Sequence, residues 1–365
     1  MVLLFPVTIT EIVHGEVTVK MDPKRPTIKE VAKAAGVSTQ TVSRVINDRP
    51  DVAPETRDRI HRTIAELGYQ PSALARSLIQ KRSYTLGVVT AGLKYIGPSR
   101  TLNGITQQAE QSGYTLLLKE LSSFDAENTL PQIQALLSHH VDGIVWAVPQ
   151  VGDNHRWIET SLSEVPVPMV FLATEARAGL TVVNYDNFTG GRSATEHLLQ
   201  QGYRHIGHIA GPLDWWESRE RKAGWKAALA AAGIVALETH STEGNWSSAS
   251  GDIAFRQLLE QYPEMDGVFV GNDQMALSVL QIASQQGIAV PAALGVVGFD
   301  GIAESPYYSP PLTTVVQDQI LLGSTVVMEI VRRIEEERAG DGRTGARSIV
   351  LTPELEVRSS SSRAN

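Results

Sequence analysis

The chain has 365 residues, 42% of them hydrophobic, with a net charge of −8 and no cysteine. This length is enough for two or three packed units, and the lack of cysteine excludes disulfides, thiolate metal sites and cysteine nucleophiles. No apolar run approaches the roughly 20 residues of a membrane span, so we expect no membrane partner.

The first 24 residues are expected to be an N-terminal extension without a folded role. The opening MVLLFPVTITEIVHGEV lacks the basic start of a signal peptide, and Met21 offers a second translation start. An absent signal and an absence of cysteine favour a reducing compartment, so we expect a cytoplasmic protein.

Charge is distributed unevenly along the chain. Residues 24–82 contain 12 Lys and Arg against 6 Asp and Glu, a net of +6, which leaves −14 for the remainder. This asymmetry predicts a small basic module on an acidic body, and a basic module favours a nucleic-acid partner.

Residues 25–70 have the pattern of a helix-turn-helix. Thr27 and Glu30 form a capping box, Gly36 suits a left-handed turn, and Ser38 suits the cap of a second helix. An ordinary helical hairpin with a solvated face is the alternative. The second helix would bury Val42, Val45 and Ile46 and present Thr39, Gln40, Ser43, Arg44 and Asn47, whose side chains suit bases and phosphates.

A third helix and a linker follow. The third helix would start at Pro54 and bury Ile60, Ile64 and Leu67. Residues 71–82 then form a short hinge helix, in which Leu78 pairs with an apolar residue one turn earlier. Such a helix is too small to have a core of its own and needs a partner.

Residues 83–357 alternate short Val- and Ile-rich runs with helical patterns. Two successive sets of this alternation predict an α/β body with two lobes, each with a parallel sheet, and a ligand cleft at the carboxyl ends of the strands. We expect the N-lobe at about 83–184 plus 313–343, the C-lobe at about 185–312 plus 344–357, and a tail at 358–365.

Polar residues follow several of these strands. An Arg, an Asn and an Asp can pair with the hydroxyls of a sugar, and a Trp can cover its apolar face. Each residue also has a purely structural alternative: Asp273 as a helix cap, Trp246 as core. The residues that suit a sugar are Arg221, Trp246, Asn272, Asp300 and, near a crossover, Gln319.

Signals for an enzyme or a metal are weak. No phosphate-binding loop, zinc-protease motif or nucleophile elbow is present. His205 and His208 lie three apart on a predicted strand and face opposite sides. We therefore expect no catalytic residue, no metal and no cofactor.

Two groups of motifs resemble one protein family. TIKEVAKAAGVSTQTVSRVIND with YQPSALARSL, and then GPLDWWESRERKAGW, NDQMAL, VVGFD and PPLTTVVQD, are similar in order to the lactose-repressor/galactose-repressor family of bacterial transcription regulators. The resemblance covers about residues 25–357. It implies an all-α helix-turn-helix head, a hinge helix and a bilobed effector domain like a periplasmic binding protein.

The resemblance also implies two sets of site residues. Leu78 matches a leucine that wedges a base step in the minor groove. The implied DNA-binding residues are Thr27, Ser38, Thr39, Gln40, Thr41, Ser43, Arg44, Asn47, Ala75, Arg76 and Leu78. The implied effector-binding residues are Tyr95, Gly97, Pro98, Thr101, Arg221, Trp246, Asn272, Asp300 and Gln319.

Departures from the family's type member bear on specificity. Ala173 replaces an Asp, Gln319 replaces a Phe, and the loop at residues 214–217 is bulkier and more acidic. The predicted function is that of a repressor that a galactoside, or another mono- or disaccharide, releases from a palindromic operator. A corepressor-dependent regulator, an activator or, more remotely, a sugar-transport protein are the alternatives. The tail lacks leucine heptads, which favours a homodimer over a tetramer.

Overall fold

The computed structural model describes residues 26–46, 49–69, 82–124, 129–340 and 345–363. The chain divides into two compact units, with the division between Arg82 and Ser83. The expected extension (1–24) and nearly all of the expected hinge helix lie outside the described residues. Within the described ranges, no helix combines the length and the apolar character that a membrane span requires.

The described residues of the first unit form a head with three helices. Its helices are α1 (Ile28–Ala35), α2 (Thr39–Ile46) and α3 (Pro54–Leu67). The capping box predicted at the start of α1 is present, and Gly36 ends the helix with a φ of 66°, the left-handed conformation that glycine adopts without strain. The head's core consists of Val31, Ala32, Ala35, Val42, Val45 and Ile60.

One predicted core position of the head is wrong. Leu67 is 39% exposed, whereas Thr63 is buried and its hydroxyl donates to the Arg59 carbonyl at 2.9 Å. Leu67 is the last residue of α3, directly before the left-handed Gly68, and it is not part of the head's core. The core of the head is therefore shorter than the apolar spacing predicted.

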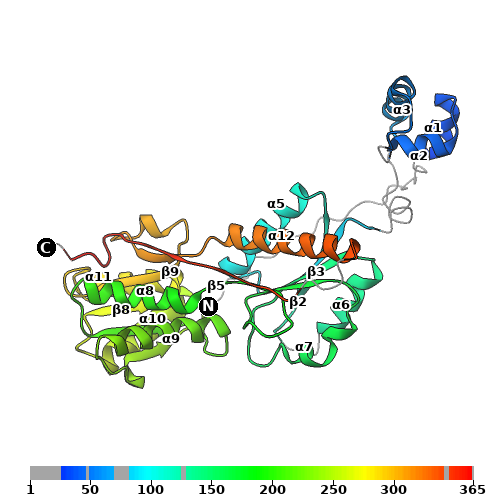
Figure 1. The fold of residues 1–365 in the computed structure, drawn as a ribbon. Coiled ribbons are helices and arrows are strands. Elements are labelled where there is room, and N and C mark those ends of the chain that lie inside the picture. Colours follow the sequence, from blue (N-terminus) through cyan, green and yellow to red (C-terminus); the bar gives the residue numbers. More distant parts are fainter. Residues whose placement is uncertain (1–25, 47–48, 70–81, 125–128, 341–344, 364–365) are drawn as a thin grey trace, which may run out of the picture. The chain divides into compact units, whose positions relative to one another are not determined.

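The second unit consists of two lobes, each a twisted sheet covered by helices (Figure 1). The first lobe has a six-stranded sheet in the order β11-β5-β4-β3-β1-β2, in which all pairs are parallel. Its strands are β1 (Thr85–Ala91), β2 (Thr115–Leu121), β3 (Gly143–Ala147), β4 (Met169–Leu172), β5 (Val182–Tyr185) and β11 (Ser348–Leu351). Its helices are α5 (Ile96–Gln111), α6 (Thr129–Ser138), α7 (Arg156–Ser161) and α12 (Gln319–Arg338).

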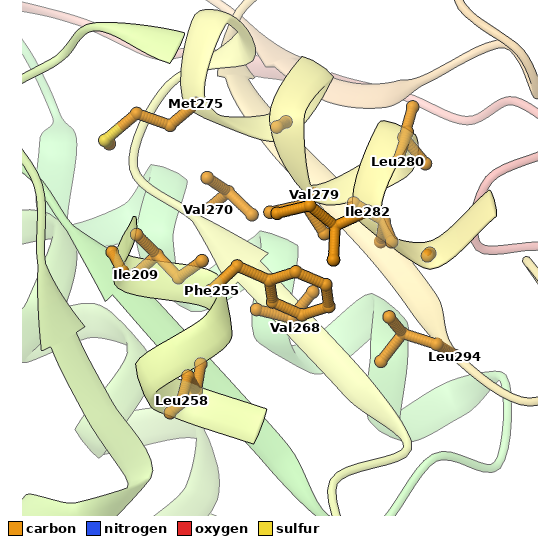
Figure 2. Packing of buried hydrophobic residues seen from close by; sticks show 14 of the residues in the cluster. Ile209, Phe255, Leu258, Val268, Val270, Met275, Val279, Leu280, Ile282 and Leu294 are labelled. Carbon is orange, nitrogen blue, oxygen red and sulfur yellow. The ribbon is translucent and has the colours of Figure 1, made fainter. Parts of the chain in front are cut away.

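The second lobe has a sheet in the order β12-β10-β9-β8-β6-β7, in which the edge strand β12 alone is antiparallel to its neighbour. Its strands are β6 (Ile206–Ala210), β7 (Ser241–Glu243), β8 (Gly267–Val270), β9 (Gly295–Asp300), β10 (Thr313–Val316) and β12 (Glu354–Glu356). Its helices are α8 (Asn187–Gln200), α9 (Trp216–Ala231), α10 (Ser248–Gln261) and α11 (Asp273–Gln285). Figure 2 shows one side of its core, where Phe255 packs among aliphatic side chains of β8 and α11.

The chain crosses between the lobes three times, and two of the predicted crossings are displaced. Strand β10 pairs with β9 in the second lobe, although residues 313–316 were assigned to the first. Strand β11 pairs with β5 in the first lobe, although residues 348–351 were assigned to the second. A short Val- and Ile-rich strand can pack in either sheet, so its own residues do not show which sheet it joins. The choice depends on a partner strand that is distant in sequence, and for β11 this strand lies more than 150 residues earlier.

The predicted tail is part of the second lobe rather than a separate segment. Ser360 is fully buried: its N–H donates to the Pro311 carbonyl at 2.9 Å, and its carbonyl accepts from Val296 N–H at 2.8 Å. The Ser361 hydroxyl contacts His197 Nε2 at 2.8 Å. Serine side chains are small enough for the chain at Ser360 and Ser361 to lie this close to the sheet.

Helices α8 and α9 pack with their backbones nearly in contact, and this contact positions Arg221. A Cβ on Gly191 would lie 2.2 Å from the Arg221 carbonyl oxygen, and one on Gly224 would lie 2.1 Å from the Phe188 carbonyl oxygen. A Cβ atom does not approach another heavy atom this closely, so only glycine at these two positions permits the observed spacing of α8 and α9.

We expect Gly191→Ala to lower the free energy of unfolding by about 1–3 kcal/mol, the usual cost of overpacking. The added methyl group must push the backbone of Arg221 away. Chemical denaturation would measure the loss. The matched control is Gly345→Ala, because a Cβ there meets open space at an ordinary φ. Equal stability of the two variants would contradict this account of the α8–α9 contact.

Candidate functional site

The exposed face of α2 is the candidate DNA surface. Thr39, Gln40 and Arg44 are exposed, and Ser43 is half-buried. Arg44 forms an ion pair with Asp51 at 3.3 Å, in which both side chains remain about half exposed. An exposed pair of this kind is weak, so a phosphate can replace Asp51 as the partner.

Three of the implied DNA-binding residues have structural hydrogen bonds. The Ser38 hydroxyl accepts from Thr41 N–H at 3.1 Å and contacts the Thr41 hydroxyl at 2.9 Å, so Ser38 caps α2 and Thr41 is its partner. Thr27 caps α1 and its hydroxyl bonds Glu30 at 3.0 Å. The remaining implied residues, Asn47, Ala75, Arg76 and Leu78, lie outside the described residues.

A cavity between the lobes brings the second set of implied residues together. Its volume is about 900 Å³, the open mouth included. All nine implied effector-binding residues line it: Tyr95, Gly97, Pro98, Thr101, Arg221, Trp246, Asn272, Asp300 and Gln319. The first lobe contributes the first turns of α5, and the second lobe contributes the carboxyl ends of β8 and β9 and the start of α9. This is where ligands bind in open α/β sheets.

Arg221 is the centre of the polar array. It is 7% exposed, and its planar guanidinium lies 3.8 Å from the ring centre of Phe299. Nε donates to Asn187 Oδ1 at 2.9 Å, and Nη1 donates to the Gly271 carbonyl at 2.6 Å and to Asp300 Oδ1 at 3.2 Å. This fixed guanidinium holds Asp300 in the cavity wall, where the carboxylate can accept from ligand hydroxyls.

A chain of amides connects this array to the first lobe. Gln317 Nε2 donates to Asn187 Oδ1 at 3.1 Å, and Gln319 Nε2 donates to Gln317 Oε1 at 3.2 Å. The Thr101 hydroxyl then donates to Gln319 Oε1 at 2.7 Å. Thr101 belongs to α5 of the first lobe and Asn187 to α8 of the second, so this chain of hydrogen bonds joins the two lobes.

The helix-capping role predicted for Asp273 belongs to its neighbour. Asn272 Oδ1 accepts from Met275 N–H at 2.9 Å and caps α11, while its Nδ2 donates to the Trp246 carbonyl at 2.9 Å. Asp273 is fully buried and accepts from Ser305, Thr314 and Ile302 instead. Asn272 therefore shapes the cavity by holding the backbone of Trp246.

Aromatic side chains close one end of the cavity. Trp215 lies edge-on to Tyr95, Phe124 and Trp246, at centroid distances of 5.4, 5.2 and 5.8 Å. Trp246 is 8% exposed, in both the cavity wall and the core, so its predicted ligand-contact and core roles are compatible. Within the described residues, Nε1 of Trp246 has no hydrogen-bond partner.

Backbone strain is concentrated around the cavity. Of the five described non-glycine residues with positive φ, three line it: Ala173 at 52°, Trp246 at 73° and Asp300 at 98°. Such conformations cost about 1–3 kcal/mol each and persist where the surroundings impose them, most often at binding sites.

A backbone bridge joins the lobes beside the cavity. Gly152 N–H donates to the Asp214 carbonyl and Trp216 N–H donates to the Gln150 carbonyl, both at 2.9 Å. These bonds make Val151 and Trp215 antiparallel partners across the two lobes. The loop that the sequence marked as bulky thus both lines the cavity and connects the lobes.

Burial raises the pKa of the acidic groups near the cavity. The pKa of Glu217 rises to about 7 because burial disfavours its charge, although Arg221 opposes the shift. Burial also raises the pKa of Asp273 to about 7, with a contribution from the charge of Asp300. The pKa of Asp300 rises by burial, while Arg221 acts in the opposite direction.

Several cavity residues were missed by the sequence prediction. Asn187 and Gln317 hold the guanidinium and the amide chain, and Gln274 lies in the first turn of α11. Each follows a strand directly or within two to four residues, as the predicted ones do, so the same rule of polar residues after strands could have found them. Asn184 and Tyr185, at the end of β5, complete this group.

Two buried histidines, His155 and His208, have structural partners. His208 is fully buried between Trp225 and Phe269, and burial lowers its pKa to about 3. His155 lies between Trp146 Nε1 at 3.0 Å and the Thr174 hydroxyl at 2.8 Å, and burial lowers its pKa to about 4. In the described part of the chain, no three His, Cys, Asp or Glu side chains are grouped as metal ligands would be.

A helix-turn-helix head on a bilobed binding body defines the class of ligand-responsive DNA-binding regulators. Residues 27–72 match the family "Bacterial regulatory proteins, lacI family", and residues 195–361 match the "Periplasmic binding protein-like domain". The chain is 33% identical to the lactose operon repressor of Escherichia coli K12 over 309 residues, which is 85% of each chain.

Solved structures show the same likeness. The lac repressor dimer bound to operator and the anti-inducer ONPF is 32% identical, with a TM-score of 0.82, and the match covers 93% of this chain and 99% of that one. A complex of the transcriptional regulator CelR with cellobiose is also 32% identical, with a TM-score of 0.68 and coverage of 92% and 100%. This chain belongs to the lacI family of bacterial regulatory proteins.

Proposed function

We propose that the protein is a transcriptional repressor that a sugar releases from its operator. The observation that carries the proposal is the buried array of Arg221, Asp300, Asn187 and Gln317 in the interlobe cavity. A fixed guanidinium and carboxylate facing an aromatic wall suit vicinal hydroxyls and the apolar face of a sugar ring. The CelR relative binds a sugar, cellobiose, in a body of this fold.

The lining of the cavity favours a sugar other than a simple galactoside. Ala173 lacks the carboxylate of the family's type member, and Gln319 lacks its apolar ring. Trp215, Trp216 and Trp246 give the cavity three indole rings from the second lobe alone. Two broad apolar walls suit a glucoside or a β-linked disaccharide, whose ring faces are flat, better than a ring with an axial hydroxyl.

The proposed mechanism couples two sites through the lobes. A homodimer places two α2 helices on the half-sites of a palindromic DNA duplex, where side chains such as Gln40 contact base edges. The sugar binds between the lobes and favours one arrangement of them. If that arrangement binds DNA less well, then DNA must weaken sugar binding by the same factor.

A ligand that strengthens DNA binding, instead of weakening it, is the second candidate. The lac repressor relative was crystallised with an anti-inducer while bound to its operator, so ligands of this family can accompany the DNA-bound state. A ligand that strengthens DNA binding would make the protein a corepressor-dependent regulator. The head argues against a sugar-transport protein, and the reported relatives, which are regulators, argue against an enzyme. Because the proposed action is on DNA, we propose the cytoplasm as its location.

Intrinsic fluorescence tests the proposal, because three of the six tryptophans line the cavity. We expect a saturable change in emission with one of a panel of galactosides, glucosides and disaccharides, and no change with the others. The operator-free protein suffices for this titration. A flat response to every sugar would contradict the proposed effector class.

A further inference from the structure

The interlobe cavity contains one carboxylate oxygen with no assigned function. Glu217 lies in the first turn of α9 and lines the cavity. Its Oε2 is buried and has no hydrogen-bond partner among the described residues. A buried acceptor without a donor is costly, and its usual explanation is an absent ligand or a proton on the group itself.

The surrounding charges do not supply the missing donor. Arg221, one turn later on α9, directs its guanidinium to Asn187, Gly271, Gln317 and Asp300. Arg219 donates instead to the carbonyls of Leu213 and Asp214. Asp300, on β9, adds a second negative charge, which Arg221 and, from α5, Arg100 offset.

Other carboxylates near the cavity already have their donors. Asp300 accepts from Arg221, and Asp273 accepts from two hydroxyls and one backbone N–H. Glu217 is therefore the carboxylate of the cavity wall that has an oxygen without a described donor, and burial raises its pKa to about 7. Trp246, which also lines the cavity, has a buried Nε1 without a partner among the described residues.

We infer that Glu217 is a specificity-determining residue: its Oε2 accepts a hydrogen bond from a hydroxyl of the bound sugar, and sugar binding therefore releases a proton. The proton leaves the Glu217 carboxyl for solvent as the sugar hydroxyl takes its place as donor. This inference rests on the proposed sugar binding. It adds that binding is stronger at higher pH and that the sugar needs a hydroxyl facing Glu217.

Calorimetric titration of the full-length protein with the sugar found by fluorescence tests the inference. Because the ionised carboxylate binds, affinity should rise about tenfold from pH 6 to pH 8. Titrations in buffers of different ionisation enthalpy should show about half a proton released per site at pH 7. Glu217→Gln should bind more weakly and with little dependence on pH.

The matched control is Glu220→Gln, which removes a carboxylate from the same helix but not from the cavity lining. It should keep the wild-type pH profile. A flat wild-type profile, or a slope that survives in Glu217→Gln, would overturn the role of Glu217 while sugar binding itself stands. No binding of any sugar at any pH would overturn the proposed function and this inference together.

Discussion

Replacing Asp300 by Asn should shift the response to sugar to much higher sugar concentrations while leaving operator binding intact. The carboxylate is held by Arg221 Nη1 at 3.2 Å in the cavity wall, and it has room to accept from ligand hydroxyls. Hydrogen bonds to a charged group contribute about 1.5–3 kcal/mol, so we expect sugar affinity to fall roughly 10- to 150-fold. Asn retains the shape of Asp and tolerates the φ of 98° at this position better than Ala.

The measurement compares sugar titrations of the protein–operator complex by fluorescence anisotropy. Asp252→Asn is the matched control, since Asp252 lies on the same lobe in an ion pair with Arg256 in which both side chains are nearly half exposed. This variant should release DNA at the wild-type sugar concentration. Release of Asp300→Asn at that same concentration would show that the sugar binds elsewhere.

Replacing Gln40 by Ala should weaken operator binding and relax its sequence preference. Gln40 is exposed on α2, whose opposite side buries Val42 and Val45 in the head's core, so the substitution leaves the head folded. A bidentate contact with one base is worth about 1–3 kcal/mol, which corresponds to roughly 5- to 150-fold in affinity. Titrations against the operator and against single-base variants of it would measure both effects.

Two further variants separate base contacts from phosphate contacts. Arg44→Ala should weaken binding to every sequence and make the salt dependence less steep, by about one phosphate contact. Glu66→Ala, at an exposed position on α3, should leave binding almost unchanged. If Gln40→Ala bound the operator as the wild type does, α2 would not be the helix that contacts the bases.

The local features of the head were predictable because their causes lie within a few residues. The capping box of Thr27 and Glu30, the left-handed Gly36 and the cap at Ser38 all depend on neighbours in the chain, and all three are present. Leu67 was predicted wrongly because apolar spacing does not show where the packing partner of a helix ends.

The lobes were predictable as a class, but not their exact boundaries. Alternating strands and helices imply parallel sheets wherever they occur. The sheet that β10 or β11 joins depends on pairing with a strand that is distant in sequence. The strand sequences themselves, TTVV and SIVL, do not indicate which strand that is. The same limit applies to the tail, whose Ser360 is buried by contacts with residues about 50 and 64 positions earlier.

The cavity was predictable in part. Arg221, Asn272 and Asp300 were found from polar residues after strands and from the family resemblance, and they line one cavity. The cap of α11 was assigned to Asp273, but Asn272 supplies it, and the donors that hold Asp273 come from residues about 30 to 40 positions later. Gln317 directly follows β10 and could have been proposed for that reason, but its contact with Arg221, 96 residues earlier, is not visible in the sequence.

Fluorescence anisotropy of the full-length protein on duplexes from upstream of its own gene would show whether a sugar releases the protein from DNA. Salt is held constant, since phosphate contacts make affinity depend steeply on it. Our account predicts tight binding to one duplex and its loss with one sugar of the panel. Tight binding that no sugar alters, or that a sugar strengthens, would contradict release by a sugar, and no binding to any duplex would contradict the DNA-binding role itself.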